Sequence, residues 1–277
     1  MTHPVPLAGV IGSPVAHSRS PALHGHWLRR YKVSGHYIPM DVAPCDLAEA
    51  LHVLPRLGFV GVNVTLPHKE AALALSHTHT DRAARIGAAN TLTFQADGTV
   101  HADNTDGFGF MASLHQSAPD WQPHQGPAVV LGAGGAARAI LVSLLESGVP
   151  EIRLANRTRA RAEALCAEFG PRVFCHDWNK PISYLKEART LVNTTALGMT
   201  GKDDLSFPFE MLHPELLVTD IVYTPLETTL LREAAARGAT VVDGLGMLLH
   251  QAAPGFERWF GRVPEVDAAL RAAVLTG

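Results

Sequence analysis

The residue types best suited to chemistry in this chain stand in one stretch, Gly61-Val-Asn-Val-Thr-Leu-Pro-His-Lys69. Its first six residues read as a strand, so Asn63 and Thr65 share one face by the two-residue period. Pro67 ends the strand and a helical pattern follows, which puts Lys69 at the junction. An edge strand followed by a surface lysine would give the same pattern, but lysine is scarce here beside arginine. We therefore expect a polar pocket wall with one ammonium group, which can act as a general acid or base.

A second polar group lies near the N-terminus, in residues 9–24. A short apolar strand and a turn precede Ser20-Pro21, which predicts a helix start with Ser20 as the N-cap and Pro21 in the first turn. Ser18 has no capping role in this interpretation. Two hydroxyls at a helix N-terminus, where free N–H groups and the positive end of the dipole meet, favour a site for a small carboxylate.

A third polar group spans residues 86–109, where a turn at Asp97-Gly98 separates two strand-like segments. This pattern predicts a hairpin that leads into a helix over 108–116. Asp106 would lie near the N-cap of that helix, and Asn90 would lie on the first strand. Taken alone, Asp106 is explained equally well as a helix cap, and Asn90 as a turn or strand amide.

The fourth group has the order of a dinucleotide-binding fold, with a strand over 127–131, a glycine turn and an amphipathic helix. The turn fits G-x-G-x-x-A, in which the first glycine permits the turn and the second permits close approach of a pyrophosphate. Its residues are Gly132, Ala133, Gly134, Gly135, Ala136 and Ala137.

The segment after the next strand indicates which dinucleotide is bound. An NAD-binding fold carries an acidic residue there for the ribose hydroxyls, but this chain has Asn156-Arg157-Thr158, with Arg161 one turn further. A carboxylate would repel a 2′-phosphate, whereas a guanidinium pairs with it. The sequence therefore predicts NADP as the cofactor.

Taken in order, these segments resemble the shikimate dehydrogenase family over nearly the whole chain. The family pattern S-x-S is matched by Ser18 and Ser20, N-V-T-x-P-x-K by residues 63–69 and N-T-D-x-x-G by residues 104–109. Further matches are the glycine loop, the N-R-T at residues 156–158, and the segments 193–199, 220–228 and 243–253.

The resemblance implies reversible, NADPH-dependent reduction of 3-dehydroshikimate to shikimate, a step of chorismate and aromatic amino-acid biosynthesis. It implies Lys69 and Asp106 as the catalytic pair, and which of the two formally transfers the proton stays open. The substrate-binding residues it implies are Ser18, Ser20, Asn63, Thr65, Asn90, Tyr223 and Gln251. The cofactor-binding residues it implies are the glycine loop 132–137, Asn156, Arg157, Thr158, Arg161, Thr195, Met199, Gly244 and Met247.

Alternating strand and helix signals predict an α/β protein of two domains. We expect an N-terminal α/β substrate domain in residues 1–106. The resemblance implies that residues 246–277 also belong to this domain, which makes it discontinuous. Residues 107–245 should form a doubly wound Rossmann domain that binds NADP, with strands near Val129, Ile152, Val173, Leu191, Val218 and Val241. The active site is expected in the cleft between the two domains.

Composition excludes several function classes. The chain has 277 residues, a formal net charge of −3 and no basic tract, so we expect no nucleic-acid partner. Its three cysteines fit no C-x-x-C spacing, and no signal peptide or bilayer-spanning stretch is evident, which favours a cytoplasmic location. The 15 histidines include the close pairs His24/His26 and His77/His79, which we interpret as surface residues rather than metal ligands. The oligomeric state, monomer or homodimer, stays open.

Two alternatives remain at this stage. One is a quinate/shikimate dehydrogenase paralogue that uses NAD or accepts a wider range of hydroxy acids. The other is a non-catalytic, ligand-sensing module with the same fold. Retention of Lys69, Asp106 and the glycine loop favours an enzyme over a sensor.

Overall fold

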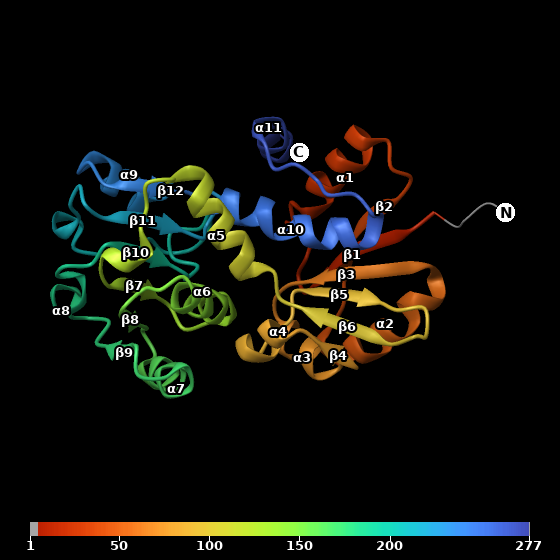
Figure 1. Cartoon of the computed structure of the whole chain (residues 1–277), viewed down its shortest axis with the longest axis horizontal. Helices are drawn as coiled ribbons and strands as arrows, with labels where there is room; N and C mark the ends of the chain where they lie inside the picture. The colour runs from red at the N-terminus through yellow and green to blue at the C-terminus, as the bar shows by residue number, and fades with distance from the viewer. Residues whose placement is uncertain (1–4, 277) are drawn as a thin grey trace. The chain divides into compact units, whose positions relative to one another are not determined.

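The computed structural model describes residues 5–276, which divide into two compact units (Figure 1). Unit 1 contains the residues up to Thr105 and those from Leu249 onwards, and unit 2 contains Asp106–Leu248. Each unit has its own six-stranded sheet. The α/β class predicted from the sequence is confirmed.

Unit 1 is built on a mixed sheet with the strand order β2-β1-β3-β5-β6-β4. The strands β1, β2 and β3 are parallel, whereas β5 pairs antiparallel with both β3 and β6, as the predicted hairpin requires. Gly98 has φ +84° in the hairpin turn, a conformation that favours glycine. The strands are β1 (Leu7–Gly12), β2 (His36–Asp41), β3 (Phe59–Val64), β4 (Thr78–His79), β5 (Thr91–Phe94) and β6 (Val100–Asp103).

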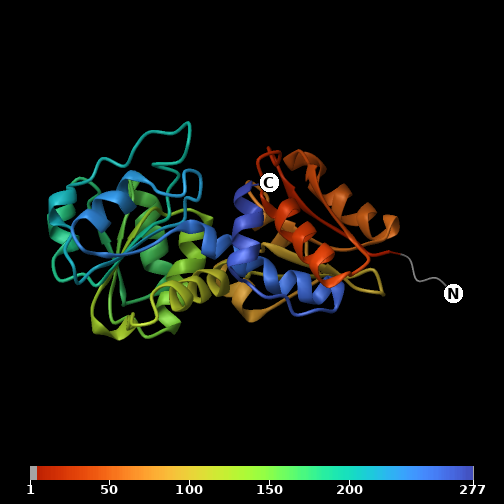
Figure 2. The ribbon, with the colours of Figure 1, turned by 90° about the horizontal axis from the view of Figure 1, so that it is seen from above.

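The helices of unit 1 lie between these strands in the sequence and at the C-terminal end of the chain. Helices α1 and α11 pack side by side, as both ribbon views show (Figures 1 and 2). The short strand β4 and the helix α4 were not predicted, because each is too short to show a periodic pattern. The helices are α1 (Ser20–Tyr31), α2 (Leu47–Val53), α3 (Lys69–Ala74), α4 (Asp81–Ile86), the later part of α10 (Gly244–Phe260) and α11 (Ala268–Thr276).

Unit 2 has an all-parallel sheet in the order β12-β11-β10-β7-β8-β9. This order, running outwards in both directions from β7, is that of a doubly wound dinucleotide-binding fold. Each of the six strands lies where the sequence predicted one. They are β7 (Ala128–Leu131), β8 (Ile152–Ala155), β9 (Val173–His176), β10 (Thr190–Asn193), β11 (Leu217–Asp220) and β12 (Thr240–Val242).

Helices cover both faces of the unit 2 sheet, and alternate strand residues point into two different cores. In β7, Val130 packs into the core that includes Ile140 of α6, whereas Val129 and Leu131 pack into the core that includes Leu230 of α9. Both cores exclude water, which explains why the strands read as continuous apolar runs. The helices of unit 2 are α5 (Asp106–Ser117), α6 (Gly135–Glu146), α7 (Arg159–Phe169), α8 (Pro181–Leu185), α9 (Thr229–Ala236) and the first residues of α10.

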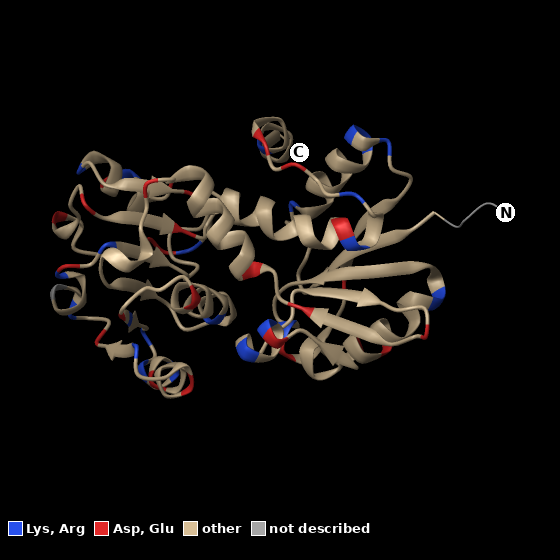
Figure 3. Cartoon of the chain, in the orientation of Figure 1, with Lys and Arg blue, Asp and Glu red and all other residues tan. Residues whose placement is uncertain are grey.

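Charged residues of both signs are intermingled over the elements of both units rather than gathered into one patch (Figure 3). Within residues 5–276, no helix has both the length and the apolar character that a bilayer crossing demands. Nor does this part of the chain bring together three or more histidine, cysteine, aspartate or glutamate side chains in a way that could hold a metal ion.

Candidate active site

The two N-terminal serines differ from the local roles that the sequence suggested. Ser20 is the first residue of α1 and is 5% exposed, while Arg19 occupies the N-cap position without a side-chain cap hydrogen bond. The prediction of Ser20 as the N-cap is therefore wrong. Ser18 instead accepts a hydrogen bond at Oγ from the backbone N–H of Ser20, at 3.3 Å. Ser18 is half-buried, and its hydroxyl proton can be donated to a ligand because the N–H of Ser20 occupies only an acceptor site on the oxygen.

Asn63 lies near the end of β3 and is 5% exposed. Its Nδ2 donates to the carbonyl oxygen of Asn90 at 3.1 Å and to Oγ1 of Thr91 at 3.2 Å. Its Oδ1 accepts from the hydroxyl of Tyr37 at 2.7 Å. Both amide protons and one lone pair of Asn63 are thus used within the protein, which leaves the second lone pair of Oδ1 for a ligand hydroxyl. Thr65, one residue beyond the end of the strand, is half-buried.

A buried network joins the start of the hairpin to α10 within unit 1. Asn90, which is 2% exposed, donates from Nδ2 to Oε1 of Gln251 at 3.1 Å. Oδ1 of Asn90 accepts from the backbone N–H of Thr105 at 2.8 Å, and the Thr105 hydroxyl donates to the carbonyl oxygen of Gln251 at 2.8 Å. Two of the predicted substrate-binding residues, 161 positions apart in the sequence, are therefore in direct contact. Thr105 was quoted in a motif but was not predicted to have a role.

Lys69 and Asp106 each begin a helix. Lys69 is the first residue of α3, after the N-cap His68, and its carbonyl oxygen accepts from the N–H of Ala89 at 2.8 Å. Asp106 is the first residue of α5, which begins two residues earlier than predicted, and it is 5% exposed. A carboxylate in the first turn interacts favourably with the helix dipole. Asp106 directly follows Thr105, whose position the network described above fixes.

The segment before Asp106 is anchored by the wholly buried carboxylate of Asp103, which the sequence reasoning missed. Its oxygens accept from Arg82 at 2.9 Å, from Thr80 at 2.8 Å and from Arg258 of α10. Burial alone would raise the pKa of Asp103, but the hydrogen bonds from Arg258, Thr80 and Arg82 outweigh it and lower the pKa to about 2. The carboxylate therefore ties the end of the hairpin to α4 and α10 as an ion.

The glycine loop between β7 and α6 fits a bound pyrophosphate. Gly132 has φ +107°, and a Cβ there would lie 2.6 Å from Oγ1 of Thr194, so only glycine suits that position. A Cβ on Gly134 or Gly135 would meet no atom within 4 Å, so the backbone of these two residues faces open space. Gly134 is the N-cap of α6 and offers no capping side chain, which leaves the first N–H groups of the helix for an anion.

The end of β8 presents guanidinium groups. Arg157 and Arg161 are exposed, and neither forms an ion pair with another residue that the structure describes, whereas the intervening Arg159 pairs with Glu163 at 2.7 Å. Asn156 donates from Nδ2 to the carbonyl oxygen of Thr158 at 2.8 Å and so braces the loop. Thr158 is the N-cap of α7 but makes no side-chain cap hydrogen bond. The two arginines, and the hydroxyl of Thr158 with them, suit the 2′-phosphate of NADP.

A second buried carboxylate, Asp220 at the end of β11, organises the loops that carry other predicted cofactor residues. It accepts from Asn193 at 3.0 Å, from the N–H of Val222 at 3.0 Å and from Thr228 at 2.8 Å. Burial raises the pKa of Asp220, and these three hydrogen bonds oppose the rise. The loop fixed in this way carries Tyr223, which is half-buried.

The remaining predicted cofactor residues lie on the segments of unit 2 that follow β10 and β12. Thr195 donates to Oδ1 of Asn193 at 2.8 Å, Met199 is 36% exposed, and Met247 is half-buried against the core. A Cβ on Gly244 would lie 2.4 Å from the carbonyl oxygen of Ile221, so α10 can begin here only with glycine. These positions follow the ends of β10, β11 and β12, which is the edge where doubly wound folds bind ligands.

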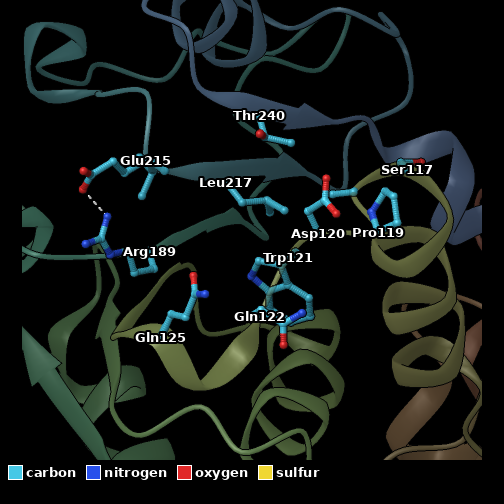
Figure 4. Close-up of a pocket in the computed structure, with 12 residues that line it drawn as sticks. Ser117, Pro119, Asp120, Trp121, Gln122, Gln125, Arg189, Glu215, Leu217 and Thr240 are labelled. Atoms are coloured by element: carbon cyan, nitrogen blue, oxygen red, sulfur yellow. Dashed lines mark hydrogen bonds and ion pairs between the residues drawn. The ribbon is translucent and has the colours of Figure 1, made fainter.

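A separate cavity of about 270 Å³ lies at the opposite edge of the same sheet (Figure 4). Leu217 and Thr240, the first residues of β11 and β12, line it, together with Trp121 and the ion pair of Arg189 with Glu215. Trp121 donates from Nε1 to Thr190 at 2.9 Å and is fixed in the wall. The strands begin here, so the cavity is not part of the expected cofactor site.

One predicted surface residue proves to be buried. His24 of α1 is wholly inaccessible, and its ring stacks on that of Tyr37 with centroids 3.9 Å apart and planes 4° apart. The prediction of a surface histidine is therefore wrong for His24, because α1 turns this side chain towards the sheet. His77 and His79 are exposed, as predicted.

Three family models match the chain. They describe a shikimate dehydrogenase substrate binding domain at residues 10–92, a shikimate/quinate 5-dehydrogenase at residues 115–199 and a shikimate 5′-dehydrogenase C-terminal domain at residues 244–274. An NADP(+)-dependent shikimate dehydrogenase of Cereibacter sphaeroides is 66% identical over 271 residues, which cover 98% of this chain and 97% of the relative. The chain belongs to the shikimate dehydrogenase family.

Solved structures of the shikimate dehydrogenase fold agree with this assignment. The enzyme of Thermus thermophilus, in complex with NADP(H) and shikimate, has a TM-score of 0.87 and 41% identity and covers 98% of both chains. A quinate dehydrogenase of Corynebacterium glutamicum, in complex with NAD, has a TM-score of 0.90 and 30% identity and covers 98% of this chain and 99% of its own. The same fold is thus found with either cofactor, so the fold alone does not decide between NAD and NADP.

Proposed function

We propose that this chain catalyses the reversible, NADPH-dependent reduction of 3-dehydroshikimate to shikimate. Membership of the shikimate dehydrogenase family supports the reaction. The observation that carries the assignment to particular residues is the buried network of Asn63, Asn90 and Gln251, which gathers three predicted hydroxyl-binding side chains within unit 1. Unit 1 is then the substrate-binding unit and unit 2 the NADP-binding unit.

The substrate is held by groups of two kinds. Ser18, Ser20 and Tyr223 bind the carboxylate of shikimate, the two serines through hydroxyls at the start of α1. Asn63, Asn90 and Gln251 bind the ring hydroxyls, and Thr65 supports both sets. Because most of these side chains are already fixed by hydrogen bonds within the protein, binding immobilises few additional rotamers.

The cofactor is held by the glycine loop and by the arginines that follow β8. The free N–H groups at the start of α6 bind the pyrophosphate, and Arg157, Thr158 and Arg161 bind the 2′-phosphate. Asn156 braces this loop, and Thr195, Met199, Gly244 and Met247 form the part of the site near the nicotinamide. When bound, NADPH supplies the hydride that adds to the carbonyl carbon.

Proton transfer falls to Lys69 and Asp106. In reduction, the pair delivers a proton to the carbonyl oxygen as the carbon is reduced, and in oxidation it accepts the proton from the hydroxyl. The positive charge of Lys69 also polarises the carbonyl and stabilises negative charge that develops on its oxygen. Asp106 orients the reacting hydroxyl and the ammonium group.

The test is a steady-state assay of the purified protein. NADPH consumption is measured with 3-dehydroshikimate, and in parallel with NADH as the cofactor and with 3-dehydroquinate as the substrate. We expect kcat/KM to be at least tenfold higher for the NADPH and 3-dehydroshikimate pair than for either alternative. Preference for NADH and 3-dehydroquinate would indicate a quinate dehydrogenase, and binding of shikimate without turnover would indicate a sensor.

Two further proposals concern the protein in the cell. The reaction draws on NADPH and on small soluble metabolites, which supports a cytoplasmic location. The network that holds the substrate-binding side chains is complete within one chain, so catalysis is compatible with either a monomer or a homodimer. Sedimentation of the purified protein at several concentrations would distinguish the two.

A further inference from the structure

Tyr37 is a buried tyrosine that the proposed mechanism does not use. It lies on β2, is 8% exposed and belongs to the small core made by the first strands of unit 1 and Trp259. Its hydroxyl donates to Oδ1 of Asn63 at 2.7 Å. A phenol has one proton, so this bond leaves the Tyr37 oxygen able only to accept.

The partner of that bond is one of the proposed substrate-binding residues. Asn63 faces the carbonyl oxygen of Asn90, which can only accept, so the amide must turn its Nδ2 that way and its Oδ1 towards Tyr37. The Tyr37 hydroxyl is therefore bonded to Oδ1 of Asn63, the atom through which Asn63 can accept a further hydrogen bond from a ligand hydroxyl.

A second proposed substrate-binding residue lies beside the same tyrosine. Burial raises the pKa of the Tyr37 phenol, and the neighbouring Ser20 side chain offsets part of that rise. Ser20 is itself buried at the start of α1. Tyr37 on β2 is thus close to Ser20 and is hydrogen-bonded to Asn63 of β3.

The ring of Tyr37 is held by aromatic packing. His24 stacks on it in parallel, and Trp27 and Phe256 pack around His24 with ring centroids 5.7 and 5.8 Å away. Neither ring nitrogen of His24 has a hydrogen-bond partner among the described residues. Burial lowers the pKa of His24 to about 3, and the nearby Asn63 side chain offsets only part of that effect. His24 is therefore a neutral, flat support for the tyrosine ring.

We propose that Tyr37 is a positioning residue for the substrate, which sets the hydrogen-bonding direction of Asn63 while His24 fixes its ring. This proposal rests on the proposed function, because it takes Asn63 as a substrate-binding residue. Tyr37 itself need not touch the substrate, and its effect passes through the Asn63 side chain to which it is bonded.

The test deletes one hydroxyl. Tyr37→Phe keeps the stacked ring, and we expect the KM for shikimate to rise about tenfold, the equivalent of one hydrogen bond, while kcat changes less than threefold. The KM for NADP should stay within about twofold, because the cofactor residues lie in unit 2. Tyr184→Phe is the matched control, since Tyr184 is 1% exposed and its hydroxyl bonds the carbonyl oxygen of Trp178 in unit 2. It should lower the melting temperature without changing the KM for shikimate.

A double-mutant cycle shows whether Tyr37 acts through Asn63. If it does, Tyr37→Phe should raise the KM by less than about twofold in the Asn63→Ala background. The proposal is overturned if the KM of the double variant rises by the product of the two single effects. It is also overturned if Tyr37→Phe alone leaves the KM for shikimate unchanged. An inactive wild-type protein in the same assay would refute the proposed function instead.

Variants of His24 test the same arrangement without altering Tyr37. His24→Phe keeps an aromatic ring beneath the tyrosine and should leave the KM for shikimate within about twofold. His24→Leu has similar bulk but cannot stack, and should raise this KM several-fold at unchanged KM for NADP. Equal KM values for shikimate in the two variants would contradict the role of the stack, even if Tyr37→Phe did not fold.

Discussion

Replacing Arg157 by alanine should weaken NADP much more than NAD. Arg157 follows β8 at the position where NAD-binding folds carry an acidic residue, and it forms no ion pair with any described residue. Its guanidinium is therefore available to the 2′-phosphate, the group that distinguishes NADP from NAD. Without it, the proposed phosphate site keeps the guanidinium of Arg161 and the hydroxyl of Thr158.

The size of the effect follows from the exposure of the site. A hydrogen bond to a charged group contributes about 1.5 to 3 kcal/mol, which corresponds to a change in affinity of roughly ten- to a hundredfold. Arg157 is exposed to solvent, which screens the interaction, and Arg161 remains in the variant. We therefore expect the KM for NADP to rise nearer tenfold than a hundredfold, while the KM for NAD changes by less than about twofold.

The measurement is the KM for each cofactor at saturating shikimate, at two salt concentrations. Arg159→Ala is the matched control, because it removes the same charge two residues away but from a side chain that pairs with Glu163. Arg159→Ala should change the KM for NADP and the KM for NAD by the same small factor. Equal losses for both cofactors in Arg157→Ala would mean that the arginine supports the loop, and the assignment of the phosphate site to it would be wrong.

Three further predictions concern unit 1. Lys69→Ala should lower kcat by about two to four orders of magnitude, because general acid catalysis supplies about that factor, while the KM for shikimate changes less than about threefold. A variant with more than half the wild-type kcat would exclude Lys69 from the mechanism. Ser18→Ala should raise the KM for shikimate more than Ser20→Ala does, because Ser18 is the more exposed and keeps a proton to donate, and equal KM values would contradict this. His24 has a folded-state pKa of about 3, below its unfolded value of 6.5, so the wild-type free energy of unfolding should fall as pH drops from about 6.5 towards 3, by at most about 1.4 kcal/mol per pH unit. In His24→Phe this slope should be smaller, as urea unfolding at several pH values would show.

The elements that the sequence predicted correctly are those with a strong local pattern. The six strands of unit 2 are buried on both faces and read as short apolar runs, and the turn at Gly132 needs a positive φ that glycine supplies. The hairpin turn at Gly98 is of the same kind. In such segments the information lies within about ten residues, so no knowledge of the tertiary structure is needed.

The errors arise where one residue has two possible partners. Ser20 before Pro21 has the pattern of an N-cap, but the helix begins one residue earlier, so Ser20 lies in its first turn and Arg19 takes the N-cap position. A local pattern states which side chains can cap a helix, and tertiary packing decides which of them does. His24 was taken for a surface residue for a similar reason, since a histidine in a helix can face either the solvent or the sheet.

Contacts over long sequence separations could not be predicted from the residues alone. Asp103 lies within the third polar group of the sequence, but its pairing with Arg258, 155 positions away, leaves no local signal. The bond between Asn90 and Gln251 is of the same kind. Both contacts attach α10 to the hairpin region, and they explain why residues from the two ends of the chain share unit 1.

The two buried carboxylates, Asp103 and Asp220, fix loops of the protein through hydrogen bonds within the chain. Asp103 is paired with two arginines, and its pKa is lowered to about 2, so it stays ionised at any pH at which the protein is used. Asp220 has only neutral donors, and burial raises its pKa. An ion pair with a buried carboxylate is costly to break from either side, because the remaining charge is left without compensation. The hairpin end before Asp106 should therefore be the more rigid of the two, which suits the catalytic role proposed for Asp106. The loop that carries Tyr223 depends instead on hydrogen bonds that cost less to open.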